Sequence, residues 1–153
     1  MNMNIKYKVA LLGCLIIVSV AAAMTVPGVY NTIKTFITAL DKKDVTELIK
    51  LSDPMSALPH QMDDVNQIIT ESKIELVSLY TDVNDAIAVT TEIIIEDTVY
   101  DEGYTQGPLV ITLIRKDNVW LVTDIDIETQ ESALEEIVRF MEKHPNAVEI
   151  IPE

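Results

Sequence analysis

Carboxylates are the only plentiful side chains in this sequence that could move a proton. Asp124 and Asp126 alternate along a predicted strand that also carries Trp120, and Glu92 lies on another predicted strand. Two carboxylates on one strand face can act as acid and base when apolar surroundings raise the pKa of one of them. The same spacing is typical of a solvated strand edge, because aspartate is seldom buried. Asp124, Asp126 and Glu92 are therefore candidate acid/base residues, with a solvated edge as the alternative.

Other catalytic and metal-binding patterns are missing from the sequence. It contains two histidines, His60 and His144, and its one cysteine, Cys14, lies in the apolar run near the N-terminus. A three-histidine zinc site therefore cannot form. Three glycines after residue 23 are too few for a dinucleotide-binding G-x-G-x-x-G loop. We expect no metal site and no cofactor, and a non-enzymatic role is favoured over an enzymatic one.

The segment 96–104 (EDTVYDEGY) combines four acidic residues with two tyrosines. It lacks the D-x-D-x-D-G spacing that wraps a calcium ion, so we expect a solvated loop. Tyrosine is enriched at contact surfaces, which makes Tyr100 and Tyr104 candidate ligand-binding residues. Trp120 is a third candidate at the mouth of a pocket, and a core position is the alternative for its ring.

An export signal is expected over residues 1–23. Lys6 and Lys8 precede a weakly polar to apolar run over residues 9–26, and small residues predict cleavage after Ala23. The run spans 18 residues, roughly the lower limit for crossing a ~30 Å hydrocarbon core, so an uncleaved membrane anchor is the first alternative. Residues 11–14 (LLGC) resemble a lipobox, whose cysteine is acylated. Because most of the apolar run follows Cys14 instead of preceding it, lipidation is the weaker alternative.

Export would place the domain formed by residues 24–153 in the periplasm or outside the cell. The chain has 11 basic and 25 acidic residues, and cleavage would remove two lysines and no acidic residue. The resulting negative net charge repels nucleic acid and anionic lipid, so contact with a membrane is expected only through the N-terminal segment. The expected partner is an unknown protein or a small apolar or polar ligand. If the anchor is retained, an accessory subunit of a membrane complex is the alternative.

The hydrophobic period changes from 3.6 to 2 near residue 74, which predicts helices followed by strands. The helices are expected from residue 29 to 40, around 45–49 with Asp44 as the cap, and over 62–69 after a loop that extends to Gln61. Strands are expected over 74–80, 86–96, 108–116 and 119–127. A last helix is expected over 130–144, and the tail 147–153 could add a strand. The predicted fold is α+β, with N-terminal helices on a curved antiparallel sheet of about four strands.

Alternation along the strands predicts which side chains share a face. In the second strand, one face is expected to carry Ile87, Val89, Thr91, Ile93 and Ile95. In the last strand, Asp124 and Asp126 are expected on the face of Trp120 and Val122. In the last helix, the buried stripe is expected to contain Leu134, Ile137, Val138 and Met141.

Helices followed by strands that close with residues 116–125 (KDNVWLVTDI) resemble the NTF2-like superfamily (SnoaL-like, cystatin-like α+β), and its small exported members in particular. The resemblance covers residues 29–128, and the helix over 130–144 departs from it. It implies a pocket on the concave sheet face and homodimers formed through that face. The superfamily contains enzymes, small-molecule binders and interaction modules. We expect a non-enzymatic binding or interaction module, with a small isomerase, dehydratase or hydrolase that uses Asp124 or Asp126 as the alternative.

Overall fold

A computed structural model describes residues 28–69, 73–96 and 104–151. The cleavage site after Ala23, the apolar run 9–26, Cys14 and Tyr100 lie outside these residues. Within the described ranges, no helix combines the length and the apolar character needed to span a bilayer.

The strands form one antiparallel sheet in the order β4-β3-β2-β1-β5. The first four are β1 (Leu76–Thr81), β2 (Asp85–Glu96), β3 (Tyr104–Lys116) and β4 (Val119–Ile127), and each pairs with the next along the chain. The tail adds β5 (Val148–Ile150) beside β1. Asp117 and Asn118 join β3 to β4 with positive φ angles of 49° and 65°, which are typical of a two-residue hairpin turn. The predicted α+β class is confirmed.

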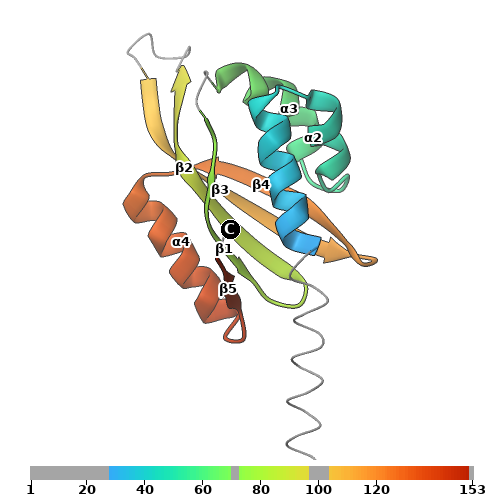
Figure 1. Ribbon diagram of the computed structural model, residues 1–153, viewed down its shortest axis with the longest axis vertical. Coiled ribbons are helices and arrows are strands. Elements are labelled where there is room, and N and C mark those ends of the chain that lie inside the picture. The colour runs from blue at the N-terminus through green and yellow to red at the C-terminus, as the bar shows by residue number, and fades with distance from the viewer. Residues whose placement is uncertain (1–27, 70–72, 97–103, 152–153) are drawn as a thin grey trace, which may run out of the picture.

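Helices cover both faces of this sheet (Figure 1). One face carries an N-terminal helix that includes residues 28–41, followed by α2 (Val45–Leu51) and α3 (Leu58–Ile68). As the sequence indicates, the Asp44 side chain caps α2 by accepting a hydrogen bond from the backbone N–H of Glu47. The predicted loop up to Gln61 is too long. Helix α3 begins at Leu58, because Pro59 occupies its first turn, where a missing N–H costs nothing.

The main hydrophobic core lies between the sheet and these three N-terminal helices. Its largest fully buried side chains come from both layers: Val29, Ile33, Phe36, Leu40, Leu48 and Met62 from the helices, and Leu79, Ile93, Leu109, Ile111, Leu113 and Val122 from the strands. Side chains of this size fill the space between the two layers. This face of the sheet is therefore the structural core.

A bulge in β2 exchanges the two faces of that strand. The pairing of β2 with β3 shifts register between Val89 and Glu92. As a result Ile87 and Val89 pack on one side of the sheet with α4, whereas Ile93 is buried in the main core on the other side. The predicted common face for Ile87, Val89 and Ile93 is wrong, because the extra residue of a bulge inverts the alternation beyond it.

A second bulge has the same effect in β4. The pairing of β3 with β4 shifts register between Thr112 and Leu113, which leaves Thr123 as the extra residue. Trp120 lies in the main core, and Ile125 packs against that core as well. The aspartates that alternate with Ile125 therefore project to the opposite side. The predicted common face for Trp120 and the two aspartates is wrong for this reason.

Helix α4 (Gln130–Lys143) covers the other face of the sheet, opposite the N-terminal helices (Figure 1). Thr129 caps it by accepting a hydrogen bond from the backbone N–H of Ser132. Ala133 and Ile137 are its buried residues, and they pack on Ile87, Val89 and Val110 in a second, smaller cluster. The predicted buried stripe is correct only for Ile137. Leu134, Val138 and Met141 are exposed.

Candidate binding groove beside α4

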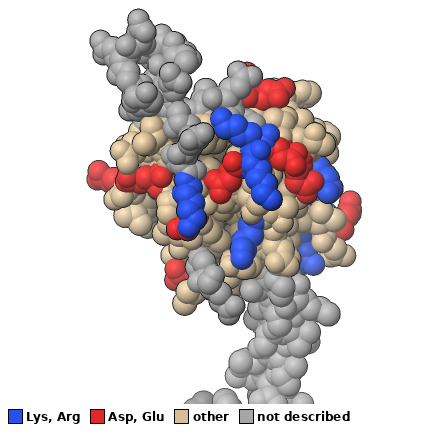
Figure 2. Space-filling view, turned by 45° about the horizontal axis from the view of Figure 1, so that its top comes forward, with Lys and Arg blue, Asp and Glu red and all other residues tan. Residues whose placement is uncertain are grey.

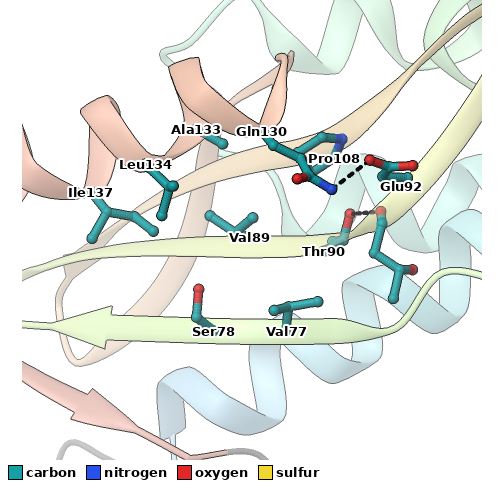
Figure 3. A pocket seen from close by; sticks show the side chains of 11 residues that line it. Val77, Ser78, Val89, Thr90, Glu92, Pro108, Gln130, Ala133, Leu134 and Ile137 are labelled. Atoms are coloured by element: carbon teal, nitrogen blue, oxygen red, sulfur yellow. Dashed lines mark hydrogen bonds between the residues drawn. The ribbon is translucent and has the colours of Figure 1, made fainter.

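A groove of about 260 Å³ lies between α4 and the sheet, on the side toward β1. Figure 3 shows its residues, with side chains of α4 facing those of β1 and β2. The sheet contributes Val77, Ser78, Val89, Thr90, Thr91, Glu92 and Pro108, and α4 contributes Gln130, Ala133, Leu134 and Ile137. Most of this lining is apolar. The groove can therefore take up a small apolar group.

Helix α4 leaves part of β1 uncovered, which is why the groove exists. The cluster beneath α4 is built mainly from β2, β3 and the helix itself. The pairing of β1 with β2 shifts register between Leu76 and Ser78, and Val77 at this irregularity is exposed. Val77 and Ser78 thus border a strip of the sheet face that α4 does not reach.

The polar end of the groove is a carboxylate held by two amides. The side chain of Gln130 donates a hydrogen bond to one oxygen of Glu92 at 2.6 Å, and Gln106 of β3 donates to the other at 2.9 Å. Figure 3 shows the contact between Glu92 and Gln130. Among the described residues, the lining contains Glu92 as its one charged side chain and no lysine, arginine or histidine. This end therefore favours a hydrogen-bond donor or a cation.

The bulge in β2 turns Glu92 toward α4, and the buried Thr90 stabilises the bulge. The Thr90 hydroxyl oxygen accepts a hydrogen bond from the backbone N–H of Leu109 at 3.0 Å and donates to the backbone carbonyl of Thr91 at 2.8 Å. These bonds satisfy backbone groups that the shifted ladder leaves unpaired.

A second contact fixes the far end of α4. His144 Nδ1 lies 3.3 Å from an oxygen of Asp82, in the link between β1 and β2, and its ring stacks on Phe140 with centroids 4.5 Å apart. With Gln130 held at the other end, the helix that forms the groove wall is tied to β2 at its first turn and to the hairpin at its last. Such a wall is preorganised for binding.

Asp124 and Asp126 lie on the α4 side of the sheet, but neither lines the groove. Both are exposed. Although the Asp126 side chain is exposed, the loss of part of its hydration, and then the neighbouring charges of Asp124, Glu128 and Glu136, raise the pKa of its carboxyl. In the pairing, Asp126 lies opposite Val110 while Glu92 lies opposite Pro108, so β3 separates them. The three candidate carboxylates therefore lie on the same side of the sheet, but only Glu92 belongs to the groove.

The aromatic candidates are distributed differently. Trp120 is only 4% exposed and lies in the main core, next to Gly28 of the N-terminal helix. Tyr100 lies outside the described residues, and of Tyr104 only the backbone, at the start of β3, is described. The structure places Trp120 on the opposite side of the sheet from the groove, in the core position that the sequence left as the alternative.

Residues that could hold a metal ion do not gather in the part of the chain that the structure describes. No group of three or more histidine, cysteine, aspartate or glutamate side chains has suitable geometry there. The acidic surplus also does not cover every face. Figure 2 shows one face on which lysine and arginine side chains lie among aspartate and glutamate.

Most of the groove could not be found from the sequence. The sequence marks Glu92 only as a charged residue on a strand, and its hydrogen bonds to Gln106 and Gln130 become visible only in the structure. The other lining residues carry no chemical signature. One signal of the groove is present in the sequence. Gln130 is a polar residue at the start of a helix, and it lies on the same helix face as the buried Ala133 and Ile137.

Comparisons with known proteins give structural similarities only. No protein-family model matches the chain, and no curated protein matches it. It is similar to a variant of the designed protein Rd1NTF2, at 15% identity and a TM-score of 0.48, over 65% of this chain and 96% of that one. A protein from Xanthomonas campestris, described as a calcium/calmodulin dependent protein kinase II association domain, is 13% identical with a TM-score of 0.41, over 63% and 81% of the two chains.

A third solved structure is a SEC-C motif containing protein from Rhodopseudomonas palustris. It is 10% identical with a TM-score of 0.41, over 60% of this chain and 71% of that one.

Proposed function

We propose that this protein is an extracytoplasmic, non-enzymatic binding module, and that the groove beside α4 is its binding site. The observation that carries the proposal is the lining of the groove, which is apolar along its floor and wall and ends in the carboxylate of Glu92. The matching ligand has an apolar body and a positively charged or hydrogen-bond donating end. Such a ligand could be free or could be part of a partner.

The energetics of this site combine burial with a charged hydrogen bond. Removing apolar area from water contributes roughly 25 cal/mol per Å². A donor that replaces water at Glu92 adds a hydrogen bond to a charged acceptor, which is stronger than one between neutral groups. A small aliphatic amine is the simplest molecule with both features, and we expect it to bind with a Kd on the order of 1 mM.

Binding is tested by titrating hexylamine into the ¹⁵N-labelled protein, with its N-terminus read by intact mass. We expect saturable shifts of the amide signals of Val77, Val89 and Ala133. Ser78→Phe places a ring over the groove floor and should abolish them. Val83→Phe adds the same ring to an exposed position outside the groove and should leave them unchanged. Shifts that survive Ser78→Phe, or that spread over the surface, would reject the groove as the site.

The extracytoplasmic part of the proposal is supported by the charged start, the apolar run and the small residues at the end of residues 1–23. Cell fractionation with intact mass tests it. A soluble protein that begins at Met24, outside the cytoplasm, is the expected result. A chain that begins at Met1 in the membrane fraction would favour an anchored accessory subunit. A chain that begins at Met1 in the cytoplasm would contradict export.

A small enzyme is the second candidate function, because the pKa of Asp126 is raised. An acid/base carboxylate needs a pKa near the working pH. Titration of the Asp126 carboxyl carbon by NMR tests this candidate. A midpoint close to neutral pH would favour catalysis, whereas a midpoint well below pH ~6 would leave the binding module as the better explanation.

A further inference from the structure

Helix α4 carries a second apolar stripe, which is not buried against the sheet. Leu134, Val138 and Met141 follow each other at the spacing i, i+4, i+7 and are 63%, 55% and 44% exposed. Side chains at this spacing lie in one row along a helix. Ala133 and Ile137 already provide the contact with the sheet. The stripe of Leu134, Val138 and Met141, called the outer stripe below, is therefore free to contact another molecule.

Glutamates border the outer stripe along one side. Glu131, Glu135 and Glu142 are exposed, and with Leu134, Val138 and Arg139 they line a shallow hollow of about 470 Å³. Arg139 pairs with acidic residues of its own helix, at 3.3 Å from Glu135 and 2.6 Å from Glu136. Neither Glu131 nor Glu142 forms an ion pair with a described residue. The surface thus offers an apolar row next to uncompensated negative charge.

The negative charge beside the outer stripe indicates which kind of molecule can bind there. In an antiparallel two-fold pair of α4 helices, the glutamate border of one copy would face the same border of the other. Both copies would also be strongly acidic, because the net charge of the full chain is −14. An anionic membrane surface would be repelled in the same way. A helix with an apolar row and lysine or arginine beside it complements both features at once.

We propose that the outer stripe of α4 docks a basic amphipathic helix of a partner protein. The apolar row of the partner would pack on Leu134, Val138 and Met141, and its basic side chains would lie over Glu131 and Glu142. Recognition of an amphipathic helix through anchors at i, i+4 and i+7 is a general mode of peptide binding. The basic side chains would be attracted to the glutamate border and would set the orientation of the partner helix, and reversing that border would replace attraction by repulsion. Leu134 also borders the groove, but Val138 and Met141 do not line it, and occupation of the outer stripe does not require a ligand at Glu92.

The probe is a synthetic helical peptide of about 18 residues with leucines at i, i+4, i+7 and lysines beside them. Fluorescence anisotropy measures the binding of this peptide to the protein purified in the form that the cell produces. We expect Val138→Ser to raise the Kd at least about tenfold, and Glu131→Lys with Glu142→Lys to do the same. The matched controls are Val119→Ser, at a residue that is also 55% exposed, and Asp63→Lys with Asp64→Lys on α3. Both controls should keep the Kd within about twofold.

Three results would overturn the proposal. The first is that the control variants lose as much affinity as the α4 variants, which would mean non-specific attraction to an acidic protein. The second is that a peptide with glutamates in place of the lysines binds equally well. The third is a dimer in sedimentation equilibrium that Val138→Ser dissociates, which would make a second copy the occupant. Circular dichroism checks that every variant is folded. If hexylamine fails to bind the groove while the peptide binds α4, the proposed function fails and this inference stands.

Discussion

The side-chain amide of Gln130 lies 2.6 Å from the carboxylate of Glu92, and this contact joins the first turn of α4 to β2 directly after its bulge. It closes the polar end of the groove. Because Gln106 holds the other carboxylate oxygen, the charge of Glu92 has a fixed position relative to the apolar lining. A ligand therefore meets a preorganised acceptor at the end of an apolar wall.

Glu92→Gln should remove the preference of the groove for a cationic end while keeping its shape. For the wild type, we expect hexylamine to bind more tightly than hexanol, and hexanol more tightly than hexanoate, because of the carboxylate. In Glu92→Gln the Kd for hexylamine should rise about fivefold and the Kd for hexanol should change by less than about twofold. Parallel NMR titrations measure all three ligands. Equal losses for amine and alcohol would contradict the assigned role of Glu92.

Thr90→Val should destabilise the protein by about 1–3 kcal/mol, because the buried N–H of Leu109 loses its acceptor. The substitution keeps the shape of the side chain, so the loss reports the hydrogen bond. Thr38→Val is the control, because that hydroxyl is exposed on the N-terminal helix and bonds to the carbonyl of Lys34. The control should stay within about 0.5 kcal/mol of the wild type in urea unfolding. An equally small change for Thr90→Val would show that the hydroxyl does not stabilise the bulge.

Gly107→Ala should also destabilise the fold. A Cβ at this position in β3 would overlap the backbone carbonyl of Glu128, which follows β4. The backbone of Glu128 can shift only at an energetic cost, so we expect the free energy of unfolding to fall by about 1–3 kcal/mol. At Gly28 a Cβ would lie 3.4 Å from the Trp120 ring, in ordinary contact, which makes Gly28→Ala the matched control. Thermal unfolding of both variants distinguishes close backbone approach from a general effect of added methyl groups.

Asp126→Asn should stabilise the protein at neutral pH. Burial and the neighbouring carboxylates of Asp124, Glu128 and Glu136 raise the pKa of Asp126 above 3.8, so the folded state holds this proton more tightly than the unfolded state. Stability therefore falls as the pH rises from 3.8 through the raised pKa. The asparagine removes this loss.

We expect Asp126→Asn to gain a few tenths of a kcal/mol at pH ~7, a small value because the side chain is exposed and screened. The gain should shrink in salt and vanish at pH values below 3.8. Asp63→Asn on α3 makes the same change in net charge. Urea unfolding across the pH range measures both variants, and a gain for Asp126→Asn that persists at low pH would contradict the electrostatic explanation.

The order of the helices and strands could be predicted from the sequence because each has a strong local signal. The period of 3.6 through Ile33 and Ile37, the cap at Asp44 and the turn at Asp117 and Asn118 all act within a few residues. The start of α3 was missed by several residues because Pro59 is compatible with both a loop and a first helical turn.

The faces of β2 and β4 could not be predicted, because a bulge leaves no local mark in a run of β-branched residues. Thr90 and Thr123 look like ordinary strand residues, yet each lies at a register shift that inverts the side chains beyond it. The groove depends on that inversion at Glu92 and on where α4 docks, and both are set by tertiary packing. For the same reason the exposure of Leu134 and Val138 could not be read from an apolar period that fits a buried stripe equally well.

The most direct test of the central claim is to locate a bound amine by intermolecular NOEs between hexylamine and the methyl groups of the protein. We predict NOEs from the terminal methyl end of the ligand to Val77 or Ile137 and from its chain to Val89 and Ala133, with the ammonium end at Glu92. NOEs confined to the N-terminal helices and the main core, or no NOE to α4 and β2 at saturating ligand, would contradict the assignment of the groove as the binding site.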